Sequence, residues 1–123
     1  MINLVNLEGF TPLKQFFKTV LPISTPTHEA EFKSVLKLVN EIVGGSTTTK
    51  CSGSWLGETG LVEDKNESIE FYHNLDATQL KRIIKQISIY QLVTCKTKVE
   101  IVFDNNMILV DQDEIKRLME MIV

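Results

Sequence analysis

The sequence predicts an α+β domain: a ferredoxin-like βαββαβ two-layer sandwich, extended by a C-terminal hairpin strand and a short helix. Two segments carry apolar residues at helical spacing, and the stretches around them alternate between apolar and polar residues. In chain order these segments give strand, helix, strand, strand, helix, strand. The length of 123 residues fits one domain, so we expect residues 1–123 to fold as a unit.

The first 25 residues fit two interpretations. Thr11-Pro12 precedes apolar residues at helical spacing, whereas residues 16–23 are rich in strand formers. We predict a strand over 16–23, because it supplies the strand that the first helix needs before it. Residues 1–15 remain open as an edge strand, a helix or a loose arm.

Three helices are expected from their end signals. The first, over 28–43, follows the hydroxyls of Thr25 and Thr27 and ends at Gly44-Gly45, where glycine adopts a left-handed conformation at little cost. The second begins at Asp76, which has the capping-box spacing to Gln79, and we expect it to fray near Tyr90. The third runs from Asp111 to the chain end, with Glu114 in the corresponding place.

Four further strands are predicted. Residues 46–56 are rich in β-branched and small residues, while 67–73 and 98–103 alternate. In 67–73 the alternation places Ile69, Phe71 and His73 on one face, opposite Tyr72 and Glu70. Asn105-Asn106 tolerates the positive φ of a tight turn, so 107–110 is expected to return as a hairpin strand.

The sequence also resembles a loosely defined set of small uncharacterised α+β proteins of bacteria and their phages and plasmids. The fixed points of this likeness lie between Phe16 and Phe103, about 88 of the 123 residues: Leu21-Pro22, Gly44-Gly45-x-Thr47, Gly53-x-Trp55, Gly60 and Glu67. The resemblance implies the architecture and supplies no catalytic residue. The connection from Leu92 to Thr97 is longer than the resemblance implies.

Charge argues against a protein whose main task is to bind nucleic acid, because the net charge is −3. Locally the charges form two blocks. Residues 58–76 carry six acids against Lys65, and residues 77–99 carry five bases and no acid: Lys81, Arg82, Lys85, Lys96 and Lys98. We expect these blocks to face each other across neighbouring elements or across a homo-oligomer, and a basic docking patch is the alternative.

Sites for metals and cofactors are not indicated. Cys51 and Cys95 lack the spacing of a zinc site, and two buried thiols are expected. The acids Glu58, Glu63, Asp64, Glu67 and Glu70 match no calcium loop. Gly44-Gly45-Ser46-Thr47 and the residues up to Lys50 suggest a phosphate loop, but they close a helix where such a loop opens one. We therefore expect no metal and no cofactor. No long apolar run occurs, so a cytoplasmic protein without membrane contact is expected.

The candidate binding surface is the sheet face that the helices leave uncovered. Tyr72, Glu70, Glu100 and Lys98 should project from it by alternation. Lys50 or Trp55 could join them, although a period of two puts these residues on opposite faces unless a bulge at Gly53 changes the register. For Trp55, packing against neighbouring side chains is favoured over stacking on a ligand.

Three functions fit these observations. The first is a non-enzymatic binding module that self-associates through its sheet and recognises a small molecule or a protein partner; with the phage or plasmid resemblance, a host factor or nucleotide signal is a conceivable target. The second is a small enzyme with Glu70, Tyr72 and His73 around a pocket between subunits. The third is a nucleic-acid binder that uses the basic block.

Overall fold

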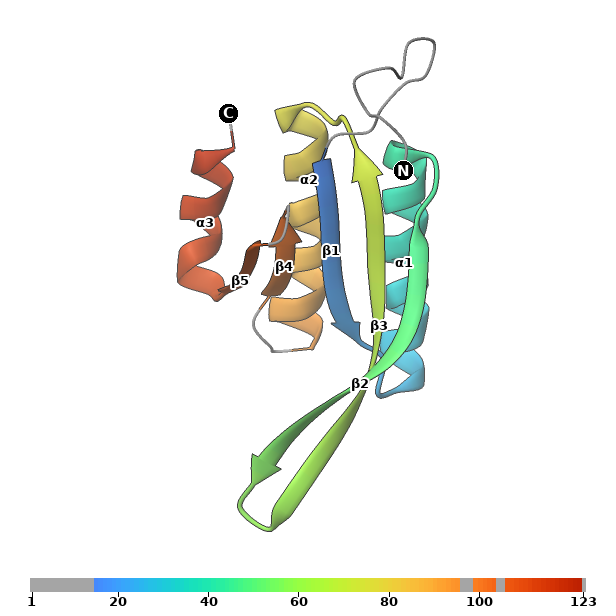
Figure 1. Cartoon of the computed structure of the whole chain (residues 1–123), viewed down its shortest axis with the longest axis vertical. Coiled ribbons are helices and arrows are strands. Elements are labelled where there is room, and N and C mark those ends of the chain that lie inside the picture. The colour runs from blue at the N-terminus through green and yellow to red at the C-terminus, as the bar shows by residue number, and fades with distance from the viewer. Residues whose placement is uncertain (1–14, 96–98, 104–105, 123) are drawn as a thin grey trace, which may run out of the picture.

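The computed structural model describes residues 15–95, 99–103 and 106–122 of the chain, and Figure 1 labels their elements. The predicted α+β class is confirmed, since the described residues form a five-stranded antiparallel sheet and three α-helices. The elements in chain order are β1 (Gln15–Pro22), α1 (Pro26–Val43), β2 (Thr47–Gly57), β3 (Gly60–His73), α2 (Ala77–Ser88), the π-helix η2 (Ile89–Thr94), β4 (Val99–Phe103), β5 (Asn106–Val110) and α3 (Gln112–Met121).

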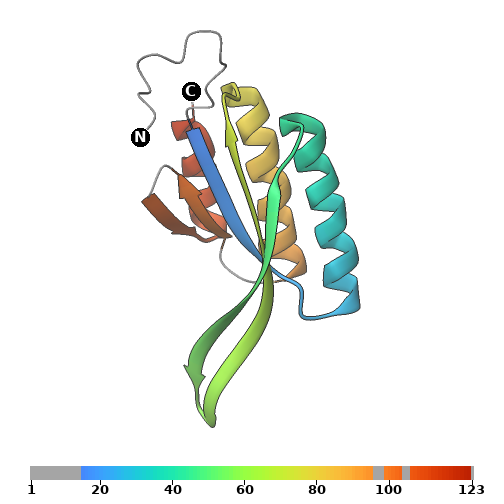
Figure 2. The same ribbon diagram turned by 45° about the vertical axis from the view of Figure 1, so that its right-hand side comes forward.

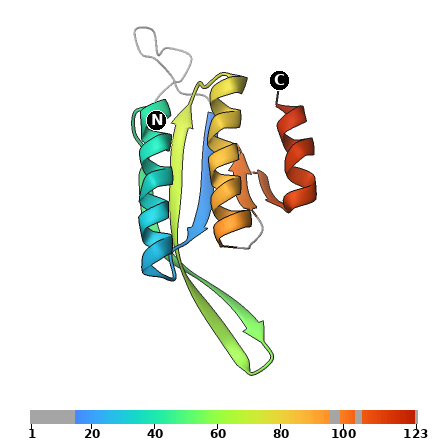
Figure 3. The ribbon, with the colours of Figure 1, turned by 180° about the vertical axis from the view of Figure 1, so that it is seen from behind.

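The strands lie in the order β2-β3-β1-β4-β5, and every neighbouring pair is antiparallel. Helices α1 and α2 lie side by side on one face of this sheet, as Figure 3 shows from behind. Helix α3 flanks β5 at the edge of the sheet. The opposite face carries no helix in the described part of the chain (Figure 1).

The end signals of the helices act as the sequence predicts. Thr25 caps α1 by accepting a hydrogen bond from the His28 amide, and Gly44 ends the helix with φ 88° and a hydrogen bond from its amide to the Asn40 carbonyl. Asp76 and Gln79 form the reciprocal capping box at the start of α2. Asp111 caps α3 through the Glu114 amide.

The core lies between the sheet and α1 and α2. Alternate residues of the central strands enter it, and Phe17 stacks on Phe71 at 5.1 Å between ring centroids. The fully buried or nearly buried apolar residues from sheet and helices include Leu21, Ile69, Val99, Ile101, Phe32, Val39, Ile83, Ile84 and Ile87. The predicted inward face of 67–73 is confirmed, because Ile69, Phe71 and His73 are buried while Tyr72 is exposed.

The predicted fraying of the second helix near Tyr90 is wrong. The chain continues as the π-helix η2, whose wider turn directs two buried polar side chains at the end of β1. The Tyr90 hydroxyl contacts the carbonyl oxygens of Pro22 and His28. Gln91 Nε2 donates to the Val20 carbonyl at 3.0 Å, and Thr19 Oγ1 donates to the Glu100 carbonyl at 2.9 Å.

These bonds have a clear structural purpose. The β1–β4 pairing ends at Thr19↔Ile101, so the carbonyls of Val20 and Glu100 lie just beyond the ladder. A buried carbonyl without a partner is costly, and side chains replace the missing ladder here.

Two predicted boundaries require correction. β3 begins at Gly60, seven positions before the predicted start at Glu67, because residues 60–66 pair with β2 although their mixed charges obscure alternation. The pairing of β2 with β3 keeps one register from Thr47↔Glu70 to Gly57↔Gly60, so no bulge occurs at Gly53. Strand 107–110 is confirmed by β5, whereas the conformation of residues 1–14 and the turn residue Asn105 lie outside the described residues.

Among the described residues, no helix combines the length and apolar character that a membrane crossing requires.

Replacing Gln91 with leucine should remove the bond to the Val20 carbonyl and leave that oxygen unpaired. We expect the free energy of unfolding to fall by about 1–3 kcal/mol in urea denaturation. The matched variant Gln86→Leu, on the same helical segment but half-buried, should change it by less than about 0.5 kcal/mol. Equal losses in the two variants would contradict the role given to Gln91.

Phe71 and Tyr72 are adjacent aromatic residues on opposite faces of β3, so they test the face assignment. In dilute solution, Phe71→Ala should lower the free energy of unfolding by about 3–5 kcal/mol, because it empties a packed core site. Tyr72→Ala should lower it by about 1 kcal/mol or less, the value of a cross-strand contact. A larger loss for Tyr72→Ala would show that the sheet face is assigned the wrong way round.

Candidate functional site

The uncovered sheet face carries a continuous set of side chains from all five strands. The register places Thr47, Glu70, Lys18, Val102 and Met107 in one row across the sheet. The neighbouring row on the same face holds Thr49, Ser68, Val20, Glu100 and Leu109. Most of these rows are apolar or neutral, which is unusual for a sheet face that only water covers.

Aromatic residues mark one end of this face. Phe16 lies opposite Tyr72 in the β1–β3 ladder, and the two rings contact each other with centroids 5.0 Å apart. Tyr72 is 62% exposed, although it is a large aromatic residue on β3, an inner strand of the sheet. The pair therefore forms an aromatic surface accessible to another molecule.

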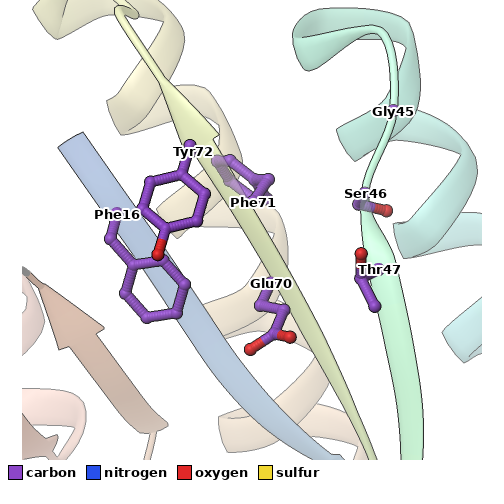
Figure 4. A pocket seen from close by; sticks show the side chains of 7 residues that line it. All are labelled: Phe16, Gly45, Ser46, Thr47, Glu70, Phe71 and Tyr72. Atoms are coloured by element: carbon purple, nitrogen blue, oxygen red, sulfur yellow. The ribbon is translucent and has the colours of Figure 1, made fainter. Parts of the chain in front are cut away.

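A cleft of about 310 Å³ opens beside this pair, as Figure 4 shows. Phe16, Tyr72 and Glu70 form one side, and Ser46 and Thr47 lie across from them. The cleft thus combines aromatic rings, one carboxylate and two hydroxyl groups.

The turn after α1 positions the hydroxyl side of the cleft. Gly44 adopts the left-handed conformation that turns the chain out of the helix, and the Ser46 hydroxyl donates to Asn40 Oδ1 at 2.7 Å. The turn follows the carbonyl end of α1, where the helix dipole is negative, so it does not attract phosphate. The sequence argued against a phosphate loop because this segment follows a helix, and the geometry agrees with that argument.

The described side chains of the cleft suit the binding of a ligand better than acid–base or nucleophilic chemistry. Glu70 accepts hydrogen bonds, Ser46 and Thr47 both donate and accept, and the rings favour flat apolar groups or cations. Lys18 lies opposite Glu70 on the neighbouring strand. Neither cysteine nor histidine is among the residues that line it.

The structure does not bring all of the predicted site residues together. Tyr72, Glu70 and Glu100 project from the uncovered face as expected, with Glu100 on β4 rather than beside the cleft. Lys50 does not join them: it lies on the covered side, near Glu67 and Phe32 of α1. Its even position in an unbroken register is the reason. Lys98 lies outside the described residues.

Trp55 pairs with Val62 near the tip of the β2–β3 hairpin and does not line the cleft. Its indole Nε1 donates to Asp64 Oδ2 at 3.1 Å, and half of the side chain is exposed. Because more than half of Trp55 is exposed, its packing role stays a prediction.

His73 does not meet Glu70 and Tyr72 in one cavity. It is only 4% exposed and lies on the covered face 5.6 Å from the Phe71 ring, where its Nδ1 accepts a hydrogen bond from the Leu75 amide. Adjacent strand positions point to opposite faces, so His73 points away from Glu70 and Tyr72, which share the uncovered face.

Three members of the predicted basic patch lie on α2. Arg82 and Lys85 are exposed and Lys81 is half-buried on the outer side of the helix, whereas Lys96 and Lys98 lie outside the described residues. The acids from Glu58 to Glu70 are spread along β3 and the hairpin tip. No cluster of three metal-ligating side chains occurs in residues 15–95, 99–103 and 106–122.

The expectation of two buried thiols is wrong for Cys51, which is exposed on β2, while Cys95 is half-buried. Burial raises the pKa of the Cys95 thiol above its ordinary value. Burial likewise raises the pKa of Tyr90, and the neighbouring Cys95 adds to this shift. Both groups therefore stay protonated near neutral pH, which makes Cys95 a poor nucleophile.

Five residues that line the cleft were not among the predicted binding residues, namely Phe16, Gly45, Ser46, Thr47 and Phe71. Phe16 could have been found, because the predicted strand 16–23 puts it on the face opposite Phe17. Ser46 and Thr47 could not, since only the β1–β3 and β2–β3 registers bring them across from Tyr72.

Comparison with known proteins gives little further information. No protein-family model and no curated protein matches the sequence. Among solved structures, the chain is similar to a Bacillus cereus protein related to NIF3, with a TM-score of 0.41 and 14% identity over 80% of this chain. This chain spans about a quarter, 26%, of the length of that protein.

Proposed function

We propose that this chain is a non-enzymatic binding module that self-associates through the uncovered sheet face and recognises a small molecule or a partner protein beside Tyr72. The observation that carries the proposal is the apolar character of this face. Tyr72, Met107 and Leu109 are each more than half exposed, and Phe16, Val20 and Val102 lie half-buried between them. Large exposed apolar surfaces of this kind mark interaction sites.

We also infer that residues 15–103 follow the ferredoxin-like βαββαβ plan. The order β2-β3-β1-β4, with α1 and α2 connecting strands on the same face, supports this assignment. Strand β5 and α3 then form the C-terminal addition. In such a two-layer plan the reverse of the sheet is available to a second molecule.

A second copy of the chain fits this face because its charges are self-complementary. Lys18 lies in one row with Glu70, and Glu100 lies in the next row. A two-fold axis through the face can set Lys18 of one copy near a glutamate of the other, while the apolar residues meet at the centre. The cleft beside Tyr72 lies at the end of this surface, where a ligand would contact the edge of the interface.

We expect the chain to run as a dimer or a larger assembly of 14.0 kDa subunits in gel filtration with light scattering at micromolar concentration. Leu109→Lys, which places a charge on the apolar face, should weaken dimerisation by about tenfold or more, equivalent to ~1.4 kcal/mol. Lys37→Glu, on an exposed position of α1, is the matched control and should leave the dimer intact.

A wild-type chain that stays monomeric at these concentrations would refute the sheet-to-sheet contact. Native mass spectrometry of the purified protein tests the cleft separately: a copurified ligand should be lost in Tyr72→Ala and retained in Lys37→Glu.

A further inference from the structure

The β2–β3 hairpin extends well beyond the rest of the sheet as a two-stranded arm, which we define as residues 51–65 (Figures 1 and 2). Strand β1 pairs with β3 as far as Pro22↔Asn66, and the Ile23 amide still donates to the Lys65 carbonyl at 2.9 Å. Beyond Lys65, within the part of the chain that the structure describes, β2 and β3 have only each other as partners in the sheet. An isolated two-stranded ribbon is marginally stable in water. A second surface that packs on the arm would stabilise it.

The tip of the arm is apolar. Leu56 lies opposite Leu61 and the two side chains are 81% and 68% exposed. Glu63 follows Leu61 on the same side of the ribbon, whereas Trp55, Val62 and Asp64 lie on the other side. The Leu56–Leu61 side therefore presents two uncovered leucines beside a carboxylate.

The arm is also acidic, with Glu58, Glu63 and Asp64 against the single base Lys65. The basic residues of α2 lie behind the sheet, while the arm points away from it (Figure 3). The acids of the arm therefore do not face Lys81, Arg82 and Lys85 of α2 within one copy. These acids are available to a basic surface on a second copy.

A groove with the matching properties lies between α2, η2 and α3. It measures about 330 Å³, and its walls include Ile89 and Val93 on one side and Ile115 and Met119 on the other. Val93 is 68% exposed although it is apolar. Lys85 lines the same groove and supplies a positive charge.

We propose that the arm tip of one copy docks in this groove of a second copy, with Leu56 and Leu61 against Ile89 and Val93 and an acid of the arm near Lys85. Donor and acceptor are different surfaces, so the contact is head-to-tail and either closes into a ring or continues as a chain. It is independent of the contact through the sheet face, which joins identical surfaces.

Complementation tests this inference most sharply. One variant, Leu56→Ser with Leu61→Ser, lacks the arm tip but keeps the groove. The other, Lys85→Glu with Val93→Ser, lacks the groove but keeps the arm tip. Both also carry Leu109→Lys, which disables the proposed sheet contact, and far-UV circular dichroism with urea unfolding establishes that both fold.

In sedimentation velocity, each variant alone should be monomeric, and an equimolar mixture should form a heterodimer through its one intact arm–groove pair. The heterodimer should weaken by about tenfold between 50 and 500 mM salt, since the charged part of the contact is screened. The matched control carries Lys37→Glu in place of both Lys85→Glu and Val93→Ser. Its groove is intact, so this control should self-associate through its own arm and groove.

A mixture that remains monomeric overturns the arm–groove contact, whatever the sheet face does. A groove variant that still self-associates, while the arm variant does not, also overturns it, because the arm would then dock on a surface other than the groove. By contrast, consider a chain that carries Leu109→Lys as its single substitution. If it assembles as tightly as the wild-type chain, the sheet contact of the proposed function is refuted and this inference is not affected.

Discussion

The structure depends on the burial of one face of the sheet against two helices. Phe17, Leu21, Ile69 and Ile101 are fully buried there, and the apolar stripes of α1 and α2 complete the core. Because strand side chains alternate, burying these residues fixes what the reverse face must display. The aromatic pair Phe16 and Tyr72, the cleft beside it and the surface proposed for self-association all follow from that choice.

The π-helix η2 maintains this arrangement at the one place where the sheet ladder stops. Gln91 and Thr19 supply hydrogen bonds to carbonyls that β1 and β4 no longer satisfy for each other, and Tyr90 connects the ends of β1 and α1. Extending the helix into η2 also brings Ile89 and Val93 to the wall of the groove below α3. A local departure from α-helical geometry thus affects both the core and a candidate interface.

Much of the fold was predictable because its signals are local. Thr25, Gly44-Gly45 and Asp76 with Gln79 mark helix ends through hydrogen bonds that neighbouring residues form, and alternation over 67–73 correctly divides Tyr72 from His73. The start of β3 at Gly60 and the π-helix were missed. Residues 60–66 pair with the preceding strand of the hairpin although their own alternation is weak, and η2 makes its hydrogen bonds to β1, about 70 residues earlier in the chain.

The candidate site was predictable only in part for the same reason. Tyr72, Glu70 and Glu100 were placed correctly by the period of two, whereas assigning Lys50 required knowing that β2 keeps its register past Gly53. The cleft needs Ser46 and Thr47 from a segment more than 20 residues away from Tyr72 in sequence. The charge blocks were visible in the sequence, but the position of the arm's acids relative to the bases of α2 depends on how far the arm extends.

The central claim is that the uncovered face is a contact surface, and hydroxyl-radical footprinting at two protein concentrations measures this most directly. The account predicts that Tyr72 and Met107 react readily when the protein is dilute and become protected as the concentration rises into the micromolar range. Side chains on that face that remain equally reactive at both concentrations, in a sample whose mass has increased, would contradict it.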